Sequence, residues 1–482
     1  MRVLLIQPRQ PGRKGCRAGL RALSVAEPLG LEMVAGALLG DHEVRIADLL
    51  DPGSLERELR SFQPEACGIS CSFTVDTEQT INIAEVLRSS SASPFVFVGG
   101  HHAALNPTDF ARPAIDAVVL GEGEGVVPEM IEAISDGLPA LLHVPGLALN
   151  THVGQTLTGS RQLLENLNEL PLPVRSLSAP WRRRYHLGFR GPVASLETAR
   201  GCPYRCRFCS VWQFYRGRYR AKAAERVVEE IEAIDESHVL VTDDNFLANP
   251  SRAEAIAYLL RARKIRKRFV IQARTDSIAR HPELISLWRT AGLGSVFVGL
   301  EKIDEAGLES VQKANTVESN EAALRVLSRA GVSATASFIV DPGFDRSDFQ
   351  RLRDYVRRWR LRGASFTVLT PLPGTGLFHE LRSSLTTRDP ELFDLQHAVL
   401  PMKLDPRVFY QEFSSLYASV YSLRNMLSID NLWHLLAGLR RSRVPTARLL
   451  LQTRSAIKYL TDPDEYLAAH QPVVAGPDLR QP

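Results

Sequence analysis

An α/β fold made of two successive strand-and-helix domains and a helical end is what this sequence predicts. Short apolar runs alternate with helical patterns over residues 1–135 and again over residues 191–395, and this alternation is typical of sheets covered by helices. Residues 136–190 contain several prolines and strand fragments, so we interpret them as a connector. Residues 396–482 lack strand patterns and are predicted to form a helical C-terminal region.

The composition is typical of a soluble globular protein with several structural units. The chain has 482 residues, of which 44% are hydrophobic and 23% charged, and it is too long for one ordinary core. A net charge of +4 is too small to indicate nucleic acid as a partner. No apolar run reaches the roughly 18 residues of a membrane span, and Met1–Ile6 has the pattern of a strand and not of a signal peptide. We therefore expect a cytoplasmic location.

The N-terminal domain is predicted to contain a parallel, doubly wound sheet. Its strand-like runs cover Val3–Gln7, Glu43–Ile46, Ala66–Ser70, Phe95–Val98 and Ala117–Leu120. Helical patterns between and around them cover Pro28–Leu39, Asp76–Arg88 and Glu124–Ser135. In such sheets, ligands bind beyond the carboxyl ends of the strands.

Three segments rich in small residues stand at those carboxyl ends. They are Ser70–Thr74, Gly99–His102 and Gly121–Glu124. Glycine and serine let a bulky planar ligand approach the backbone closely. The same residues would also serve as tight strand-to-helix turns, and the residues themselves leave both interpretations open.

The second domain repeats the strand-and-helix unit. Its predicted strands are Val193–Thr198, His238–Thr242, Phe269–Ala273, Ser295–Leu300, Ser333–Val340 and Ser365–Thr370. Its predicted helices are Ser251–Lys264, Pro282–Ala291, Ser319–Ala330 and Arg346–Leu361. This pattern predicts a partial (β/α)6 barrel, in which chemistry concentrates at the carboxyl ends of the strands. Polar residues gather at those ends, namely Asp243–Asn245, Gln272, Arg274, Glu301 and Asp341–Gly343. Ion pairs between strands or helix caps are the alternative interpretation of each.

Cys202, Cys206 and Cys209 follow the first of these strands in a C-x3-C-x2-C spacing. Three thiolates can hold three irons of a [4Fe–4S] cluster and leave the fourth iron open to another ligand. A zinc site would need a fourth ligand, for which His186 is the nearest candidate, on the wrong side of a strand. A disulfide suits a small secreted domain better than a chain of this length.

The motif, with Phe208 directly before its third cysteine, resembles the radical S-adenosylmethionine (radical SAM) superfamily. In that family SAM chelates the open iron, and one electron from the cluster cleaves it to give a 5′-deoxyadenosyl radical. The resemblance implies the following SAM contacts: Asp243 and Asp244 at the amino group, Arg274 at the carboxylate, Glu301 at the ribose, and Phe208 and the backbone at Val340 around the adenine.

The first domain resembles the cobalamin (B12)-binding domain of B12-dependent radical SAM enzymes. The resemblance implies cobalamin contacts at Ser70, Ser72, Thr74, Gly99, Gly100, His101, Gly121 and Glu122. The D-x-H-x-x-G segment that supplies a lower-axial histidine in other cobalamin proteins is absent. We therefore assign neither His101 nor His102 to the cobalt.

Helices are predicted in the C-terminal region over Val408–Leu423, Leu427–Leu439 and Thr446–Leu460. No acidic residue occurs between Asp430 and Asp462, whereas the basic residues there are Arg440, Arg441, Arg443, Arg448, Arg454 and Lys458. Basic residues beside an apolar stripe suit peripheral contact with an anionic membrane surface. A helical cap with a solvated basic face is the alternative.

The two cofactors together imply C-methylation of an unactivated carbon by a class B methyltransferase of this superfamily. One SAM would supply the methyl group through methylcobalamin, a second would supply the radical, and a flavodoxin- or ferredoxin-type protein would supply the low-potential electron. The chain most resembles the hopanoid C-3 methylases, in Leu369–Thr375, Glu391–Asp394, Leu400–Lys403 and Phe409–Tyr417. That resemblance implies a lipid-like substrate methylated in ring A. The alternatives are a methylase or cyclase of pigment or other natural-product biosynthesis, and a non-catalytic cobalamin or iron–sulfur sensor.

Overall fold

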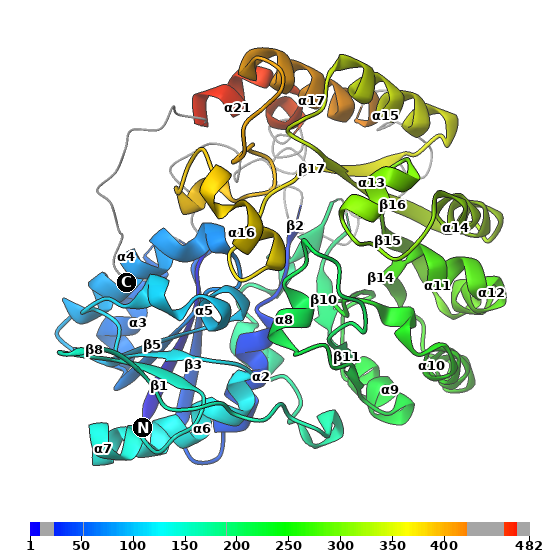
Figure 1. The fold of residues 1–482 in the computed structure, drawn as a ribbon. Helices are drawn as coiled ribbons and strands as arrows, with labels where there is room; N and C mark the ends of the chain where they lie inside the picture. Colours follow the sequence, from blue (N-terminus) through cyan, green and yellow to red (C-terminus); the bar gives the residue numbers. More distant parts are fainter. Residues whose placement is uncertain (10–23, 52, 189, 422–456, 470–482) are drawn as a thin grey trace.

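The computed structural model (Figure 1) describes residues 1–9, 24–51, 53–188, 190–421 and 457–469. It contains two large sheets, each flanked by helices, and C-terminal helices that pack beyond the last strand of the second sheet. This arrangement confirms the predicted α/β class, with a Rossmann-like sheet first, a parallel radical SAM-type sheet second and helices at the end.

The first sheet has seven strands in the order β3-β1-β4-β5-β6-β7-β8. Their bounds are Arg2–Gln7 (β1), Glu43–Asp48 (β3), Ala66–Ser70 (β4), Phe95–Gly99 (β5), Ala117–Val119 (β6), Leu147–Thr151 (β7) and Gly154–Leu157 (β8). The strands from β3 to β6 pair in parallel, whereas β7 and β8 pair antiparallel. The sheet is thus mixed and extends past residue 135, because the strand fragments of the expected connector form a hairpin that covers the edge of β6. The division into domains stays a prediction.

Helices cover both faces of this sheet. They are Leu29–Leu38 (α2), Ser54–Phe62 (α3), Thr77–Arg88 (α4), His101–Leu105 (α5), Gly123–Ala133 (α6) and Leu138–Leu141 (α7). Alternate residues of β1 enter two separate cores: Leu4 and Ile6 pack with α3 and α4, and Val3 and Leu5 pack with α2 and α6. A strand that is buried on both faces is a continuous apolar run, which is why the sequence pattern located it.

The second sheet has six parallel strands in the order β10-β13-β14-β15-β16-β17. Their bounds are Val193–Leu196 (β10), His238–Val241 (β13), Arg268–Arg274 (β14), Leu293–Glu301 (β15), Ser333–Val340 (β16) and Gly363–Val368 (β17). The larger helices around it are Ala224–Glu232 (α9), Pro250–Ala262 (α10), Pro282–Ala291 (α12), Val317–Arg329 (α14) and Arg346–Arg358 (α15). Shorter helices are Val211–Phe214 (α8), Thr275–Arg280 (α11), Glu305–Ser310 (α13) and Gly376–Leu381 (α16).

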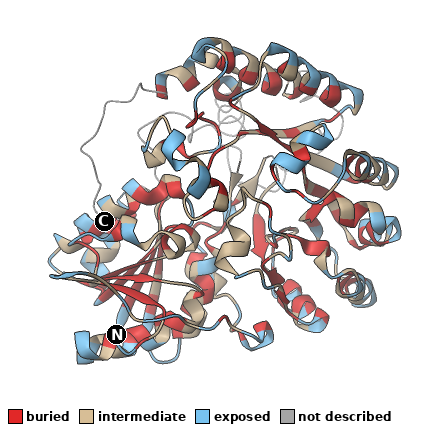
Figure 2. Ribbon diagram, viewed as in Figure 1, coloured by how far each residue is buried: buried red, intermediate tan, exposed pale blue. Residues whose placement is uncertain are grey.

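This sheet is an open barrel with its main core between the strands and the outer helices. Among the described strands, β10 and β17 are the two edges and do not pair with each other. Figure 2 shows the buried residues on the sheet and on the inner sides of the helices, with exposed residues facing outward. The fully buried Trp288 of α12 meets the rings of Phe246 and Phe269 edge to face at 4.9 and 5.5 Å.

At the C-terminal end, α17 (Pro406–Val420) and α21 (Pro463–Ala469) pack against each other. The rings of Tyr410 and Tyr466 stack at 5.3 Å between them. The helix expected over 427–439 and most of the one expected over 446–460 lie outside the described residues, as do all the basic residues named there except Lys458. Among the described helices, none combines the length and the apolar character that crossing a membrane requires.

Candidate active site

The three cysteines lie on a loop, residues 201–219, whose two ends are paired. β11 (Ala199–Arg200) and β12 (Arg220–Ala221) form a short antiparallel ladder in which Arg200 is opposite Arg220. Gly201 has a φ of +82°, and a Cβ there would lie 2.1 Å from the backbone oxygen of Arg218. Only glycine fits this crossing. The ladder closes the loop at its neck, and we call residues 201–219 the cluster loop.

The three thiols of the cluster loop are available to bind an iron–sulfur cluster. All three are free; Cys206 is 8% exposed and the other two are half-buried. Burial raises the pKa of the Cys202 thiol and raises that of Cys209 to about 12, so iron must displace their protons when it binds. Within the described residues no three ligating side chains converge on a single ion. A cubane does not require this, because each thiolate binds a different iron.

Arg274, at the end of β14, contacts the central cysteine. Its Nη1 lies 3.8 Å from Sγ of Cys206, and its guanidinium lies 3.5 Å from the centre of the Tyr204 ring. Its Nη2 donates to the backbone oxygen of Lys313 at 2.8 Å, and its Nε donates to Asp276 at 2.9 Å. The guanidinium thus contacts Cys206 and Tyr204 of the cluster loop and is itself fixed by Asp276 and Lys313. The contact of Arg274 with a SAM carboxylate stays a prediction.

Asp243, at the end of β13, is saturated by its neighbours. It is 1% exposed and accepts hydrogen bonds from the backbone N and the Oγ1 of Thr198 at 2.6 and 2.5 Å. Arg252 lies 3.6 Å away. Burial raises the pKa of Asp243 to about 6, against the lowering effect of these partners. The carboxylate therefore ties the end of β13 to the end of β10, and its expected contact with the SAM amino group is a prediction.

Asp244, the next residue, has a solvent-exposed side chain. Its pKa is raised to about 7, first by desolvation from the surrounding protein and then by repulsion from Asp243 and Glu197. A carboxylate repelled by its neighbours gains most from a cationic ligand, so the geometry suits an ammonium group here.

Glu301, at the end of β15, has a φ of +64°, which is rare for a residue with a side chain. Its Oε1 accepts from Nζ of Lys313 at 2.8 Å, and a Cβ at Gly299 would lie 2.2 Å from that oxygen. Strained backbone of this kind costs about 1–3 kcal/mol and clusters at functional sites. A pocket of about 230 Å³ adjoins it, lined among others by Lys302, Ile339, Asp341 and Phe344.

The two remaining residues expected around adenine lie on different elements. Phe208 is half-buried in the cluster loop. Val340, the last residue of β16, has its side chain in the main core, so only its backbone is available at the strand end. The expected roles of Phe208, Val340 and Glu301 stay predictions.

At the first sheet, the loops after β4 and β5 touch each other. Gly100 has a φ of +115°, and a Cβ there would lie 2.6 Å from the backbone oxygen of Cys71. Ser72 is exposed and Ser70 and Gly99 are half-buried, whereas Thr74 is buried and lies 3.2 Å from Nδ1 of His102. Gly100 therefore lets the two loops approach each other closely, and the half-buried Ser70 and exposed Ser72 leave this edge accessible to a ligand.

His101 faces the other domain. Its Nε2 lies 2.8 Å from Oγ of Ser210, the residue after the last cluster-loop cysteine, and its ring stacks on Phe214 at 4.7 Å. Burial, and then the neighbouring His102, lower the pKa of His101 to about 4. The ring is therefore neutral near pH 7 and links the Gly99–His102 segment to the loop that carries the cysteines.

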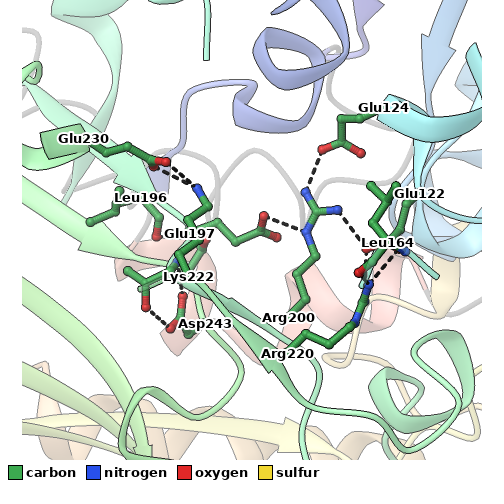
Figure 3. Close-up of polar contacts among 12 residues, drawn as sticks. Glu122, Glu124, Leu164, Leu196, Glu197, Arg200, Arg220, Lys222, Glu230 and Asp243 are labelled. Carbon is green, nitrogen blue, oxygen red and sulfur yellow. Dashed lines mark hydrogen bonds and ion pairs between the residues drawn. The ribbon is translucent and has the colours of Figure 1, made fainter. Parts of the chain in front are cut away.

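Gly121 and Glu122 follow β6 and lie at the same interface. Gly121 has a φ of +147° with open space where a Cβ would stand. Glu122 is buried and accepts hydrogen bonds from Arg200 and Arg220, which also belong to the neck of the cluster loop (Figure 3). Burial alone would raise the pKa of Glu122, but hydrogen bonds from Arg220 and the charge of Arg200 hold it below its ordinary value. The expected cobalamin contacts of the first sheet stay predictions.

The two strand-end edges therefore lie next to each other. Besides the contacts of His101 and Glu122, Nδ2 of Asn106 donates to the backbone oxygen of Pro373 at 3.4 Å. The sequence pattern did not locate Arg200, Arg220 or Ser210 as site residues. All three stand near the cysteines in the sequence, and this was the available signal. Their partners, His101 and Glu122, are far away in the sequence.

Two family models match this chain. The radical SAM superfamily model matches residues 196–356, which contain the cluster loop and β13 to β16. The B12-binding domain model matches residues 18–131. The two matches fall on the two sheets whose carboxyl edges meet.

Known proteins are similar over most of the chain. The hopanoid C-3 methylase of Methylococcus capsulatus is 34% identical over 82% of this chain and 76% of that protein. An anaerobic magnesium-protoporphyrin IX monomethyl ester cyclase of Rubrivivax gelatinosus is 29% identical over 66% of this chain and 58% of that protein. The solved structure of the radical SAM methyltransferase TsrM of Kitasatospora setae has the same fold, with a TM-score of 0.70 at 18% identity over 95% of this chain and 98% of that one.

The geometry and these similarities agree with the family resemblance of the sequence. An enzyme of this kind uses a [4Fe–4S] cluster, SAM and cobalamin, and it needs a reductant. The chain belongs to the B12-binding radical SAM superfamily and is a cobalamin-dependent radical SAM methyltransferase.

Proposed function

We propose that this enzyme methylates C-3 of hopanoids, in ring A of a pentacyclic triterpenoid. The observation that carries the substrate is the 34% identity to a hopanoid C-3 methylase, which extends over 82% of the chain and so includes both sheets. When bound, the cluster with one SAM supplies a radical that abstracts hydrogen, and the cobalamin supplies a methyl group taken from a second SAM.

The cluster loop and the second strand-end edge would bind SAM. We assign the cluster to Cys202, Cys206 and Cys209, and the SAM ammonium to Asp244, whose raised pKa favours a cation beside it. Asp243 would orient this site through Thr198, and Arg274 would hold the cluster loop through Cys206. Glu301 and the backbone at Val340 would bind the adenosine part, with Phe208 beside it.

The first strand-end edge would bind cobalamin through its backbone. The open space beside Gly121 and the small side chains of Ser70 and Ser72 support clearance for a macrocycle. The absence of a D-x-H-x-x-G segment favours a cobalt without a protein histidine. His101 brings this edge into contact with Ser210 of the cluster loop at 2.8 Å. Both reagents must reach one substrate carbon, and the proximity of the two edges supports this requirement.

A lipid assay tests the substrate. Anaerobic enzyme loaded with both metal cofactors, SAM and reductant is mixed with a lipid extract from a hopanoid-producing host, and the lipids are analysed by mass spectrometry. We expect a hopanoid fraction that gains the mass of one CH2 per methyl group, and no gain with Cys206→Ala. An unchanged hopanoid fraction while the same sample releases 5′-deoxyadenosine would contradict the hopanoid assignment.

A pigment or other natural-product methylase or cyclase is the second candidate. It is favoured by the similarity to an anaerobic protoporphyrin ester cyclase, although this chain covers only 58% of that protein. The same assay with a tetrapyrrole extract distinguishes it, because the mass gain then appears in the pigments. A non-catalytic sensor would bind cobalamin without cleaving SAM under any of these conditions.

We further propose a flavodoxin- or ferredoxin-type electron donor and a cytoplasmic enzyme that contacts a membrane surface peripherally. A lipid substrate supports the membrane contact. Co-flotation with anionic liposomes tests it, and recovery of all the protein in the lipid-free fraction would contradict it.

A further inference from the structure

A buried group of charges joins the two edges at the neck of the cluster loop (Figure 3). We propose that Glu122, with Arg200, Arg220 and Glu124, is a positioning device that fixes the cluster loop relative to the first strand-end edge. We call these four residues the interdomain clamp. The proposal rests on the cofactors of the family and not on the identity of the substrate.

The carboxylate of Glu122 is the centre of the clamp. Its Oε1 accepts from Nη1 of Arg200 at 2.8 Å and from Nη2 of Arg220 at 3.0 Å. Its Oε2 accepts from Nη1 of Arg220 at 2.9 Å and from the backbone N of Leu164 at 2.7 Å. Four hydrogen bonds saturate the lone pairs of a carboxylate, so Glu122 has no acceptor left for a ligand.

Arg200 and Arg220, on the cluster-loop side of the clamp, are each held by further partners besides Glu122. The remaining nitrogens of Arg200 donate to Glu124 at 2.6 Å and to Glu197 at 2.8 Å. Arg220 also donates to the backbone oxygen of Leu164, and its guanidinium lies 5.5 Å from the centre of the Tyr215 ring. Planar guanidinium groups held at several points allow little movement of the backbone that carries them.

The clamp lies where a movement of the cluster loop would change its distance from the first edge. Arg200 and Arg220 are paired residues of the β11–β12 ladder, so they flank both ends of the loop that carries the cysteines. Glu122 directly precedes α6 at the end of the turn that follows β6, and Glu124 is the second residue of α6, so both lie at the first edge. The side chains of Glu122, Arg200 and Arg220 are each 5% exposed. A buried carboxylate shared by two cations breaks only at high cost, which makes the separation of the two edges a fixed property of the fold.

A substitution that removes the charge but keeps the shape tests the role. In Glu122→Gln, both arginines lose their shared carboxylate while the backbone N of Leu164 keeps an acceptor. The enzyme is loaded with cluster and cobalamin, and the magnetic interaction between the reduced cluster and cob(II)alamin is measured by EPR. We expect iron content and cobalamin affinity within about threefold of the parent and a clearly altered spin–spin interaction. Turnover should uncouple, with 5′-deoxyadenosine released per methylated product rising about tenfold to a hundredfold.

Glu129→Gln is the matched control. Glu129 lies on α6, as Glu124 does, but pairs with Arg161 at the surface, at 2.6 and 2.8 Å. We expect it to leave the EPR interaction unchanged. Arg200→Lys keeps the charge and removes the planar fork, and we expect it to alter the same spectrum, so it answers the question if Glu122→Gln does not fold.

An unaltered spin–spin interaction in whichever of these clamp variants folds would overturn the proposal. The proposal would also be overturned if cobalamin affinity fell while the cobalamin-loaded molecules kept a normal EPR spectrum. Glu122 would then be a cobalamin contact. Failure of hopanoid methylation leaves the EPR result intact, so the two proposals fail separately.

Discussion

The carboxyl edges of the two sheets carry different chemistry, and the sheets themselves differ, because the first is mixed and the second is all parallel. The second edge carries charged side chains at the ends of successive strands, where Asp244 is exposed and Arg274 and Glu301 are buried against neighbouring residues. The first edge presents Gly100 and Gly121 with positive φ and little side-chain charge toward a ligand, since Glu122 is spent on the clamp. SAM is small and charged, whereas a corrin ring is wide and planar. In the proposed function, the second edge would recognise the charges of SAM and the first would leave room for the corrin ring.

This difference determines how each edge can be disabled. An edge that uses side chains loses function when a side chain is removed. An edge that uses clearance loses function when a side chain is added. Removal of a side chain at the second edge and addition of one at the first edge therefore test the two edges separately.

The largest effect is expected from Cys206→Ala. Removal of the central thiolate should abolish the iron-dependent visible absorption and reduce 5′-deoxyadenosine formation below detection, because two thiolates do not hold the cubane. Cobalamin affinity, measured by spectroscopic titration, should stay within about twofold of the parent value, since no first-edge residue contacts this side chain in the described structure. Joint loss of cobalamin binding would show that the two edges are not independent.

Gly100→Ala should act on the other edge alone. Its Cβ would stand 2.6 Å from the Cys71 oxygen on a backbone with a φ of +115°, which costs about 2–3 kcal/mol. We expect cobalamin affinity to fall about 30- to 150-fold and iron content to stay normal. Gly154→Ala is the control, because its φ is +120° with no atom within 4 Å of the added carbon. Equal loss in both variants would attribute the effect to the backbone angle and not to clearance.

The affinity for SAM should depend on pH, whereas the affinity for cobalamin should not follow the same dependence. The pKa of Asp244 is raised to about 7, so the carboxyl is protonated below that pH and must lose its proton before it pairs with a cation. We therefore expect affinity to rise up to about tenfold per unit as pH increases toward 7, and to level off above it. Isothermal titration with SAM measures this, and Asp244→Asn should remove the pH dependence. Cobalamin affinity should not follow the same curve.

Gly121→Ala should have the smallest effect. Its φ of +147° is unfavourable for alanine, but nothing lies within 4 Å of the added carbon. The free energy of unfolding should fall by about 1 kcal/mol, with a cobalamin affinity within about fivefold of the parent. Calorimetry and spectroscopic titration measure the two. A loss as large as that in Gly100→Ala would mean that the ligand itself fills the space above Gly121.

Much of the fold could be predicted because its strands are buried on both faces. β4, β16 and α12 begin and end where the apolar pattern predicted. β7 and β8 were not assigned to the sheet, because short strands among prolines give only fragments and β6, with which β7 pairs, is distant in the sequence. The helix α9 was missed although its buried residues Val227, Val228 and Ile231 follow a helical spacing.

The candidate site, too, could be predicted only in part from the sequence. The cysteines could be located because their spacing is itself the chemical signal. Asp243 and Arg274 were found at the right strand ends, but their saturation by Thr198 and by Lys313 could not be foreseen, because hydrogen-bond partners are set by tertiary contacts. The clamp was missed for the same reason: Arg220 and Glu122 are separated by 98 positions.

The neck at Gly201 has a consequence for the assembly of the enzyme. The cluster loop is closed by backbone pairing and by arginines, none of which is a metal ligand. We therefore expect the neck to form without iron, so that the cluster would be inserted into a loop whose two ends are already joined.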